Sequence, residues 1–380
     1  MFSWFKKSAP HASAEGLLAT KADQKGVKPQ FHSLAVREVR RETPESVSVA
    51  FAVPEGGTFR FIPGQYLTLR ATIDGAEVRR SYSLCSSPLS GELRVAIKQV
   101  EGGIFSTWAN THLKAGDVLD VMPPMGNFLL ETDPAKRRRY VGFAAGSGIT
   151  PVLSILKTAL EREPESEFLL FYGNRKTASI LFKNELEDLK DRFMGRLEVH
   201  HVLSREDQGS DALFGRLDAE RIRYFADHIP TVTQADAYFL CGPEAMIHAA
   251  SDVLKAQGVS ADKIHFELFT SSAPAAAPAA KSGKSSASGE AYVTVVLDGE
   301  ETHFTQSAKE FVLDAALDAG ADVPYACKGA VCCTCRAKVL EGQVEMAMNY
   351  SLTDDEVADG YVLTCQAMPR SERVVVSYDA

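Results

Sequence analysis

The sequence predicts three domains: an antiparallel β-barrel, an α/β domain with a parallel sheet, and a small α+β domain at the C-terminus. The chain has 380 residues, more than a single hydrophobic core usually organises. Its strand and helix signals change character near Arg139. Residues 270–289 are rich in Ala, Pro, Ser and Gly and lack apolar periodicity, which is typical of a tether between domains.

Short β-rich runs separated by turn signals follow residue 31, at a spacing typical of an antiparallel barrel or sandwich. These runs are 31–39, 47–53, 65–71, 79–85 and 93–98. From Arg139 on, strands alternate with Gly-rich turns and helices, which predicts a parallel sheet with ligands at the carboxyl ends of its strands. The expected strands are 140–145, 168–172, 197–203 and 237–240, and the first expected helix is 150–161.

The last module begins with a predicted hairpin around Asp298, continues with a short helix at 312–319, and closes with a strand at 373–378. Together these signals set the expected segments of the whole chain. They are a flexible lead-in at 1–30, the barrel at 31–132, the α/β domain at 133–269, a linker at 270–290 and the α+β domain at 291–380.

Composition and charge narrow the classes of function. The chain is 45% hydrophobic and 24% charged, as soluble globular proteins are, and no run of about 18 apolar residues predicts a membrane span. Lys6 and Lys7 precede no apolar run, so no secretory signal is expected and the cytoplasm is the default location. The formal charge of −9 disfavours nucleic-acid binding. Residues 291–380 hold 15 acids and 6 bases, which favours either a basic partner or solubility alone.

Seven cysteines without a secretory signal indicate metal or redox chemistry rather than disulfides. Cys327, Cys332 and Cys335 have the spacing C-x4-C-x2-C, and Cys365 lies well downstream. This is the plant-type pattern of a [2Fe–2S] cluster, in which a tight loop supplies three thiolates. A structural zinc site is the competing interpretation, although zinc sites favour two paired Cys-x2-Cys knuckles. Cys333 is surplus to the spacing and is expected to be a small buried residue.

Two motifs in the predicted barrel offer groups for a flavin nucleotide. Arg80, Tyr82 and Ser83 end a predicted strand and supply a guanidinium for a diphosphate and an aromatic face for a flavin ring. Further on, a predicted helix opens with amides and hydroxyls that suit a phosphate. The residues concerned are Gly103, Ser106 and Thr107. Each motif alone also fits an ordinary strand end or helix start, and their occurrence together favours a shared ligand.

A Gly-rich turn follows the first strand of the predicted α/β domain. Gly146 and Gly148 let the backbone approach a pyrophosphate, and Thr150 and Pro151 begin a helix whose N-terminus faces that anion. The turn departs from G-x-G-x-x-G, which leaves tight packing of helix on strand as the alternative.

The order of these motifs resembles the ferredoxin–NADP reductase superfamily over residues 31–270, and the C-terminal module resembles plant-type ferredoxins. The resemblance implies a barrel that binds FAD in preference to FMN, a nicotinamide-dinucleotide domain, and a β-grasp ferredoxin domain. It implies that Cys241, in a Cys-Gly-Pro motif, lies near the nicotinamide. It also implies that Phe269 covers the flavin and that Glu267 assists proton transfer. Without the resemblance, Cys241 and Phe269 fit ordinary buried positions.

The choice of dinucleotide is expected to depend on two strand ends. The turn at Arg175 supplies no acid for a free ribose 2′-hydroxyl. Ser204 and Arg205 resemble the Ser-Arg pair of NADP-specific relatives. NADPH is therefore favoured over NADH, although both arginines also fit ordinary surface charges.

The complete domain order resembles the reductase components of multicomponent oxygenases. Segments 172–175, 327–335, 349–352 and 360–366 are especially similar to the reductase subunits of phenylacetyl-CoA epoxidases. The resemblance implies electron transfer from NADPH through FAD and the [2Fe–2S] cluster to a terminal oxygenase. That partner is expected to be a di-iron enzyme acting on phenylacetyl-CoA in phenylacetate degradation.

Other functions share the same motifs. The acceptor could instead be a Rieske ring-hydroxylating or steroid-hydroxylating oxygenase, or a hybrid-cluster protein. A redox sensor that uses its cluster to report oxidation is the alternative from a different class. For a reductase, the tether is expected to let the ferredoxin domain swing between flavin and partner.

Overall fold

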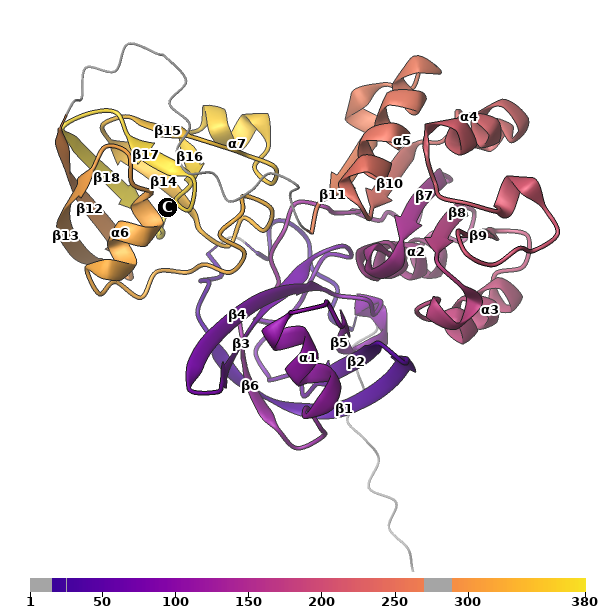
Figure 1. Cartoon of the computed structure of the whole chain (residues 1–380), viewed down its shortest axis with the longest axis horizontal. Helices are drawn as coiled ribbons and strands as arrows, with labels where there is room; N and C mark the ends of the chain where they lie inside the picture. Colours follow the sequence, from indigo (N-terminus) through magenta and orange to yellow (C-terminus); the bar gives the residue numbers. More distant parts are fainter. Residues whose placement is uncertain (1–15, 25, 270–288) are drawn as a thin grey trace, which may run out of the picture.

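The computed structural model describes residues 16–24, 26–269 and 289–380, which form three domains (Figure 1). An antiparallel barrel, a parallel-sheet α/β domain and a C-terminal α+β domain follow one another along the chain. The predicted fold class is therefore confirmed. Residues 270–288 of the predicted linker lie outside the described ranges. Within those ranges, no helix is long and apolar enough to cross a membrane.

The first domain is a six-stranded antiparallel barrel. In sheet order its strands are β4 (Ala76–Ser83), β3 (Tyr66–Ile73), β6 (Val118–Val121), β1 (His32–Thr43), β2 (Ser46–Phe51) and β5 (Leu93–Lys98). A bridge between Leu84 and Val95 joins the two ends of the sheet. Fully buried aromatic rings, including Phe51 and Phe61, fill the interior, where their burial stabilises the fold. Helix α1 (Ile104–Thr111) follows β5.

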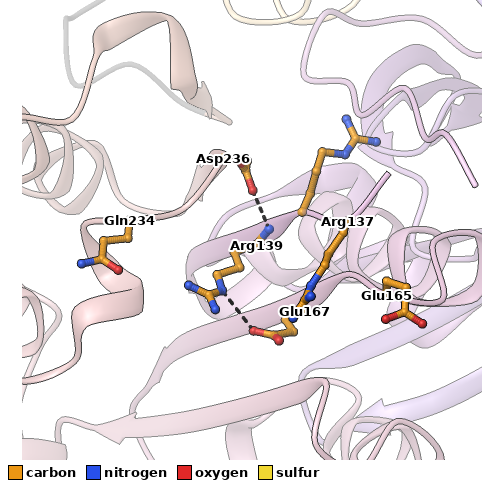
Figure 2. A pocket seen from close by; sticks show the side chains of 7 residues that line it. Arg137, Arg139, Glu165, Glu167, Gln234 and Asp236 are labelled. Atoms are coloured by element: carbon orange, nitrogen blue, oxygen red, sulfur yellow. Dashed lines mark hydrogen bonds and ion pairs between the residues drawn. The ribbon is translucent and has the colours of Figure 1, made fainter. Parts of the chain in front are cut away.

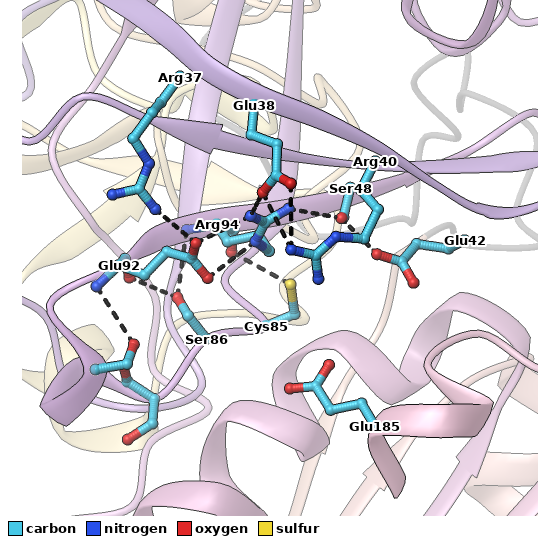
Figure 3. Close-up of polar contacts among 12 residues, drawn as sticks. Arg37, Glu38, Arg40, Glu42, Ser48, Cys85, Ser86, Glu92, Arg94 and Glu185 are labelled. Atoms are coloured by element: carbon cyan, nitrogen blue, oxygen red, sulfur yellow. Dashed lines mark hydrogen bonds and ion pairs between the residues drawn. The ribbon is translucent and has the colours of Figure 1, made fainter. Parts of the chain in front are cut away.

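A buried arginine ties three barrel strands together (Figure 3). The Arg94 side chain in β5 donates to Ser48 in β2 and pairs with Glu38 in β1 and with Glu92. Because a buried charge is tolerated only when it is paired, this network is part of the framework of the barrel.

The second domain has a five-stranded parallel sheet. Its strand order is β11 (Ile264–Glu267), β10 (Ala237–Cys241), β7 (Arg139–Ala145), β8 (Glu167–Asn174) and β9 (Leu197–Leu203). Its helices are α2 (Ile149–Arg162), α3 (Lys183–Arg192), α4 (Ala219–His228) and α5 (Glu244–Ala256). Strand order reverses between β7 and β10, and ligands bind at the carboxyl ends of strands at such a point.

Helix α2 also joins the second domain to the barrel. Its side chains share a hydrophobic core with Phe128 and Leu130 of the barrel. The Ser154 hydroxyl donates to the carbonyl oxygen of Ser86 at 2.7 Å. The two domains therefore form one packed unit around the nucleotide side of the sheet.

The third domain has a mixed sheet with an adjacent helix. The sheet order is β13 (Glu300–Ser307), β12 (Glu290–Leu297), β18 (Arg373–Ser377), β14 (Arg336–Glu341) and β16 (Tyr361–Leu363). Strands β12 and β18 are parallel, and the other neighbours are antiparallel. Helix α6 (Val312–Asp318) packs on the sheet, and the remaining elements are β15 (Val344–Met346), β17 (Ala367–Pro369) and α7 (Asp354–Ala358). This is the arrangement expected of a β-grasp domain.

In the described part of the N-terminal lead-in, residues 17–19 pack on the barrel, and most of the described residues from 20 to 30 are exposed. Leu17 packs against the barrel core, and Leu18 bridges to a barrel residue. Lys28 and Gln30 reach the third domain, where both donate to the Asp298 carboxylate. Burial of the two leucines offsets the entropy lost in ordering this short segment. Residues 1–15 lie outside the described ranges.

A hollow of about 230 Å³ lies at the amino ends of the parallel strands (Figure 2). Acids and bases both line it, and Arg139 pairs there with Glu167 across β7 and β8. Ligands of such sheets bind at the opposite, carboxyl edge. The hollow is therefore separate from the site described next.

Candidate functional site at the junction of three domains

Strand β4 and helix α1 bring the predicted flavin residues together. The ring of Tyr82 lies 5.6 Å from that of Phe105, centroid to centroid, and Phe105 meets Trp108 edge-on. Tyr82 therefore lies beside the first turn of α1. Arg80 is exposed, and its Nη1 donates to the carbonyl oxygen of Arg79 at 2.7 Å. The two motifs thus form one surface, with a ring and a guanidinium next to a helix N-terminus.

The start of α1 presents backbone amides to an anion. Gly103 is the N-cap residue and no side chain caps the helix. The Ser106 hydroxyl accepts from the Val100 N–H at 3.1 Å, and the Thr107 hydroxyl accepts from Gln99 at 3.4 Å. A Cβ atom at Gly103 would lie 2.5 Å from the Ser106 oxygen. Ser106 therefore shapes the turn, and the free helical amides are the groups left for a phosphate.

The predicted nucleotide turn lies at the point where strand order reverses. Gly146 has φ 55° and open space where a Cβ would be. A Cβ on Gly148, in contrast, would lie 2.0 Å from the carbonyl oxygen of Cys241 at the end of β10. Gly148 thus permits close packing, whereas Gly146 leaves backbone open to a ligand. The Thr150 hydroxyl donates to the carbonyl oxygen of Ser147 at 2.9 Å and stabilises the turn before α2.

The ends of β8 and β9 place the two predicted arginines side by side. The Arg205 N–H donates to the carbonyl oxygen of Arg175 at 2.9 Å, and Ser204 lies one residue earlier. Both arginines are exposed. The neighbouring acid Glu206 is engaged by the Thr177 hydroxyl and N–H at 2.6 and 2.9 Å. The arrangement offers positive charge to an anionic group at this edge.

The three predicted residues Ser83, Cys241 and Glu267 converge between the barrel and the sheet. The Ser83 hydroxyl donates to Glu267 Oε2 at 3.0 Å. Cys241 is fully buried and pairs in register with Glu267 across β10 and β11. Burial raises the pKa of Glu267 to about 8, and the hydrogen bond from Ser83 opposes that rise. Phe269 lies just beyond β11 and is 37% exposed. A proton-carrying carboxyl therefore lies at the carboxyl edge of the sheet, facing β4.

The four predicted ligand cysteines lie in two pairs. Cys327 and Cys332 hydrogen-bond to each other, which, together with backbone amides, lowers the pKa of Cys327 to about 6. Cys335 and Cys365 form the second pair. Among the described residues, no three His, Cys, Asp or Glu side chains converge to hold one metal ion. Four thiolates close together are the ligand set of a [2Fe–2S] cluster.

The backbone of the cysteine loop, residues 327–335, is bent towards the sulfur atoms. Lys328, Ala330 and Cys333 have φ of 52°, 63° and 45°. The left-handed conformation costs a non-glycine residue about 1–2 kcal/mol. In this conformation of the loop, the Gly329 N–H donates to Cys327 Sγ at 3.2 Å. Strain of this kind is typical of loops that hold a ligand.

Tyr66 and Thr334 form a contact that the sequence does not predict. The Tyr66 hydroxyl lies 3.2 Å from Thr334 Oγ1 and 3.5 Å from Cys333 Sγ. Tyr66 is also paired with Ser83 across β3 and β4. The cysteine loop therefore meets the barrel one strand away from the predicted flavin residues. In the sequence Tyr66 is one more apolar strand residue, so nothing distinguishes it.

Family models match each of the three domains. An oxidoreductase FAD-binding domain matches residues 33–129, an oxidoreductase NAD-binding domain matches 143–252, and a 2Fe-2S iron-sulfur cluster binding domain matches 295–370. The chain is therefore an NAD(P)H-dependent oxidoreductase whose cofactors are FAD, a nicotinamide dinucleotide and a [2Fe–2S] cluster.

Full-length relatives define the family. The chain is 46% identical over 353 residues to a component of the 1,2-phenylacetyl-CoA epoxidase of Escherichia coli K12, covering 92% of this chain and 98% of that one. It is 35% identical to the ferredoxin reductase component of 3-ketosteroid-9-alpha-monooxygenase of Mycobacterium tuberculosis, covering 91% and 95%. The chain belongs to the reductase components of oxygenase systems.

The fold is also that of a solved reductase. Phthalate dioxygenase reductase superposes with a TM-score of 0.57 at 23% identity, over 91% of this chain and 98% of that one. The likeness shows that the three-domain order is a known architecture.

Proposed function

We propose that the chain is the NADPH-dependent reductase of a phenylacetyl-CoA epoxidase, and that it supplies a di-iron oxygenase in phenylacetate degradation. The observation that carries the proposal is the meeting of three domains at one place. Ser83 and Glu267 join the barrel to the nucleotide domain, and Tyr66 joins the barrel to the cysteine loop. The 46% identity to a phenylacetyl-CoA epoxidase component supports this acceptor over the steroid system at 35%.

The residues at the junction have two roles, because some bind the flavin nucleotide and others hold a proton. FAD, when bound, exchanges two electrons with a nicotinamide and single electrons with an iron–sulfur cluster. Tyr82 supports the flavin ring, and Arg80 and the amides that open α1 hold its diphosphate. Glu267, protonated at neutral pH, and Ser83 hold a proton near the flavin. Phe269 is exposed enough to cover the ring.

The nucleotide domain holds the nicotinamide dinucleotide at the carboxyl edge of its sheet. The open backbone at Gly146 and the N-terminus of α2 receive the pyrophosphate. Gly148 lets the α2 turn approach Cys241, which lines the nicotinamide position. In the third domain, Cys327, Cys332, Cys335 and Cys365 would hold the [2Fe–2S] cluster, which accepts and releases one electron at a time.

The preference for NADPH follows from the two arginines at the ends of β8 and β9. Arg175 and Arg205 bind the 2′-phosphate, and Ser204, which joins β9 to Arg205, lies next to them. Because a charge-assisted hydrogen bond contributes about 1.5–3 kcal/mol, Arg205→Ala should raise the KM for NADPH by roughly tenfold or more and leave that for NADH unchanged. Arg223→Ala, an exposed arginine on α4, is the matched control. Equal effects on both nucleotides would contradict this specificity.

The acceptor is tested by reconstitution. Purified chain, NADPH and the oxygenase subunits of phenylacetyl-CoA epoxidase are combined, and consumption of phenylacetyl-CoA is followed. The proposal expects turnover that stops when this chain is left out. Reduction of FAD and cluster without consumption would leave the reductase chemistry intact and overturn the acceptor. Rieske and steroid-hydroxylating oxygenases are the next acceptors in the same assay.

Two further proposals concern the functional class of the protein and its location in the cell. A reductase sustains turnover with cytochrome c as acceptor, whereas a redox sensor shows almost none. We place the activity in the cytoplasm, because the cysteines of the described residues form no disulfide and that compartment keeps thiols reduced.

A further inference from the structure

The ferredoxin domain is docked on the barrel through several separate polar contacts. Tyr66 and Thr68 on β3 contact Thr334, with 3.2 and 3.3 Å between the oxygen atoms. Asn127 donates to Glu356 at 2.8 Å at another point. A further contact is made by Arg79 in β4. Contacts at several points restrict rotation as well as separation of the two domains.

Arg79 differs from the other contacts in its charge and in the number of its partners. Its side chain is 6% exposed. From the ferredoxin domain, Asp322 Oδ1 lies 3.0 Å from its Nη2, and the carbonyl oxygen of Val323 lies 3.4 Å from its Nη1. The guanidinium carbon lies 4.4 Å from the centre of the Tyr325 ring. Within the barrel, Arg79 pairs with Glu77 at 2.7 Å.

These contacts match what a guanidinium requires when it leaves water. A buried charge is costly unless its hydrogen bonds are satisfied, and a planar guanidinium is satisfied by a carboxylate, a carbonyl group and an aromatic face. The ferredoxin domain supplies all three to Arg79. If that domain moves away, Arg79 keeps Glu77 and the Phe31 ring, whose centre lies 5.2 Å from the guanidinium carbon, and loses the three partners of the ferredoxin domain together.

Strand β4 links this contact to the flavin side of the barrel. Arg79 is the direct neighbour of Arg80 and lies on the same strand as Tyr82 and Ser83. On the other side of the interface, Asp322 precedes the loop that carries the ligand cysteines. One arginine therefore connects the strand expected to bind FAD with the domain that holds the cluster.

We propose that Arg79 is the positioning residue that fixes the ferredoxin domain on the barrel for the flavin-to-cluster step. The inference rests on the proposed function. Arg79 touches neither cofactor; it acts through Asp322, by setting how β4 and the cysteine loop face each other. Electron transfer slows as donor and acceptor move apart, so loss of this contact slows that step and spares the hydride step.

The test uses Asp322→Lys in the holoprotein, because Asp322 is 77% exposed and its substitution spares both cores. Flavin bleaching by NADPH and the appearance of the reduced-cluster signal in electron paramagnetic resonance are followed separately. The inference expects unchanged bleaching, a cluster signal slowed several-fold, and faster amide hydrogen exchange in residues 331–334. The matched control is Asp318→Lys, the same charge change four residues earlier, which should leave all three readouts unchanged.

A second variant assigns the effect to Arg79. In an Arg79→Gln background, Asp322→Lys should add little, because residues that act through one contact are not additive. Wild-type rate and exchange in Asp322→Lys would overturn the inference, as would equal losses in Asp318→Lys or an undiminished effect in the Arg79→Gln background. Absence of cluster reduction in the unmodified protein would instead contradict the proposed function itself.

Discussion

At the residue scale, Glu267 has the clearest chemical consequence. Its carboxyl is partly enclosed at the end of β11 and accepts a hydrogen bond from Ser83 at 3.0 Å. Burial raises its pKa from 4.5 to about 8, so the neutral acid is the form present at pH 7. A neutral acid can donate a proton, which a carboxylate cannot, as the role proposed for Glu267 requires.

The pH dependence follows from that shift. NADPH-driven flavin reduction should fall as pH rises through about 8, where Glu267 loses its proton. Glu267→Gln should remove this step from the pH profile and, since general acid catalysis contributes about 10²–10⁴-fold, slow the reaction at neutral pH. Stopped-flow bleaching of the flavin between pH 6 and 9 measures both effects. A profile that keeps its step in Glu267→Gln would show that another group titrates.

The same shift predicts a change in stability. The folded-state pKa lies above that of the unfolded chain, so the unfolded state ionises first as pH rises from 4.5 towards 8. This residue therefore lowers the free energy of unfolding progressively across that window. Denaturant titrations of wild type and Glu267→Gln should show the difference narrowing at acid pH.

At the scale of elements, the two glycines of the α2 turn separate packing from binding. Gly148→Ala places a Cβ 2.0 Å from the Cys241 carbonyl oxygen, so it should destabilise the protein by about 1–3 kcal/mol. Gly146→Ala meets open space and should cost about 1–2 kcal/mol through its left-handed φ of 55°. It should also raise the KM for NADPH. Denaturant unfolding and steady-state kinetics of both variants distinguish the two roles.

The cysteine loop provides a second matched pair. Cys332→Ser removes a ligand and should abolish the cluster signal while leaving flavin reduction by NADPH intact. Cys333→Ser should keep the cluster, because Cys333 belongs to neither thiol pair and its contact is with Tyr66. Iron content and electron paramagnetic resonance of the two proteins provide the measurement. Loss of the cluster in Cys333→Ser alone would reverse the assignment.

The sequence predicts the elements that have strong local signals. Strands β5 and β9 coincide with the predicted runs 93–98 and 197–203, and α2 differs from its predicted range by one residue at each end. The short elements β6, β11, α7 and β14 to β17 have no prediction, because a few residues carry too little periodicity. The four cysteines expected to bind the cluster could be predicted from their spacing in the sequence alone.

Contacts between domains could not be predicted from the sequence in this way. Tyr66 and Arg79 are ordinary strand residues in the sequence, and their partners Thr334 and Asp322 lie more than 200 residues away. Likewise, the sequence does not show that the hydroxyls of Ser106 and Thr150 hydrogen-bond within their own turns. Such pairings depend on tertiary packing, which local patterns do not encode.

At the scale of the whole molecule, the ferredoxin domain is docked on strands β3 and β4 of the barrel. The swinging expected of the tether therefore starts from a defined contact, and release of the domain has to break it. Lys28 and Asp298 form a solvent-exposed ion pair, in which the two side chains are 56% and 38% exposed. Such pairs contribute about 0–1 kcal/mol.

The exposed Lys28–Asp298 pair and the contact of Asp322 with the buried Arg79 should therefore differ in how strongly their loss slows cluster reduction. Lys28→Ala should slow cluster reduction little, and Asp322→Lys should slow it strongly. Added salt should weaken the exposed pair first, because screening acts on charges in water. Stopped-flow cluster reduction at increasing ionic strength measures the order. A Lys28→Ala variant as slow as Asp322→Lys would place the main contact at the N-terminal segment.

The central claim is that electrons pass from NADPH through the barrel to the cluster within this one chain. Anaerobic rapid mixing with NADPH, frozen at successive times, tests it most directly. The account predicts that the flavin bleaches first and that the reduced-cluster signal follows at a rate independent of protein concentration. A cluster signal that is absent, or whose rate rises in proportion to protein concentration, would contradict transfer within the chain.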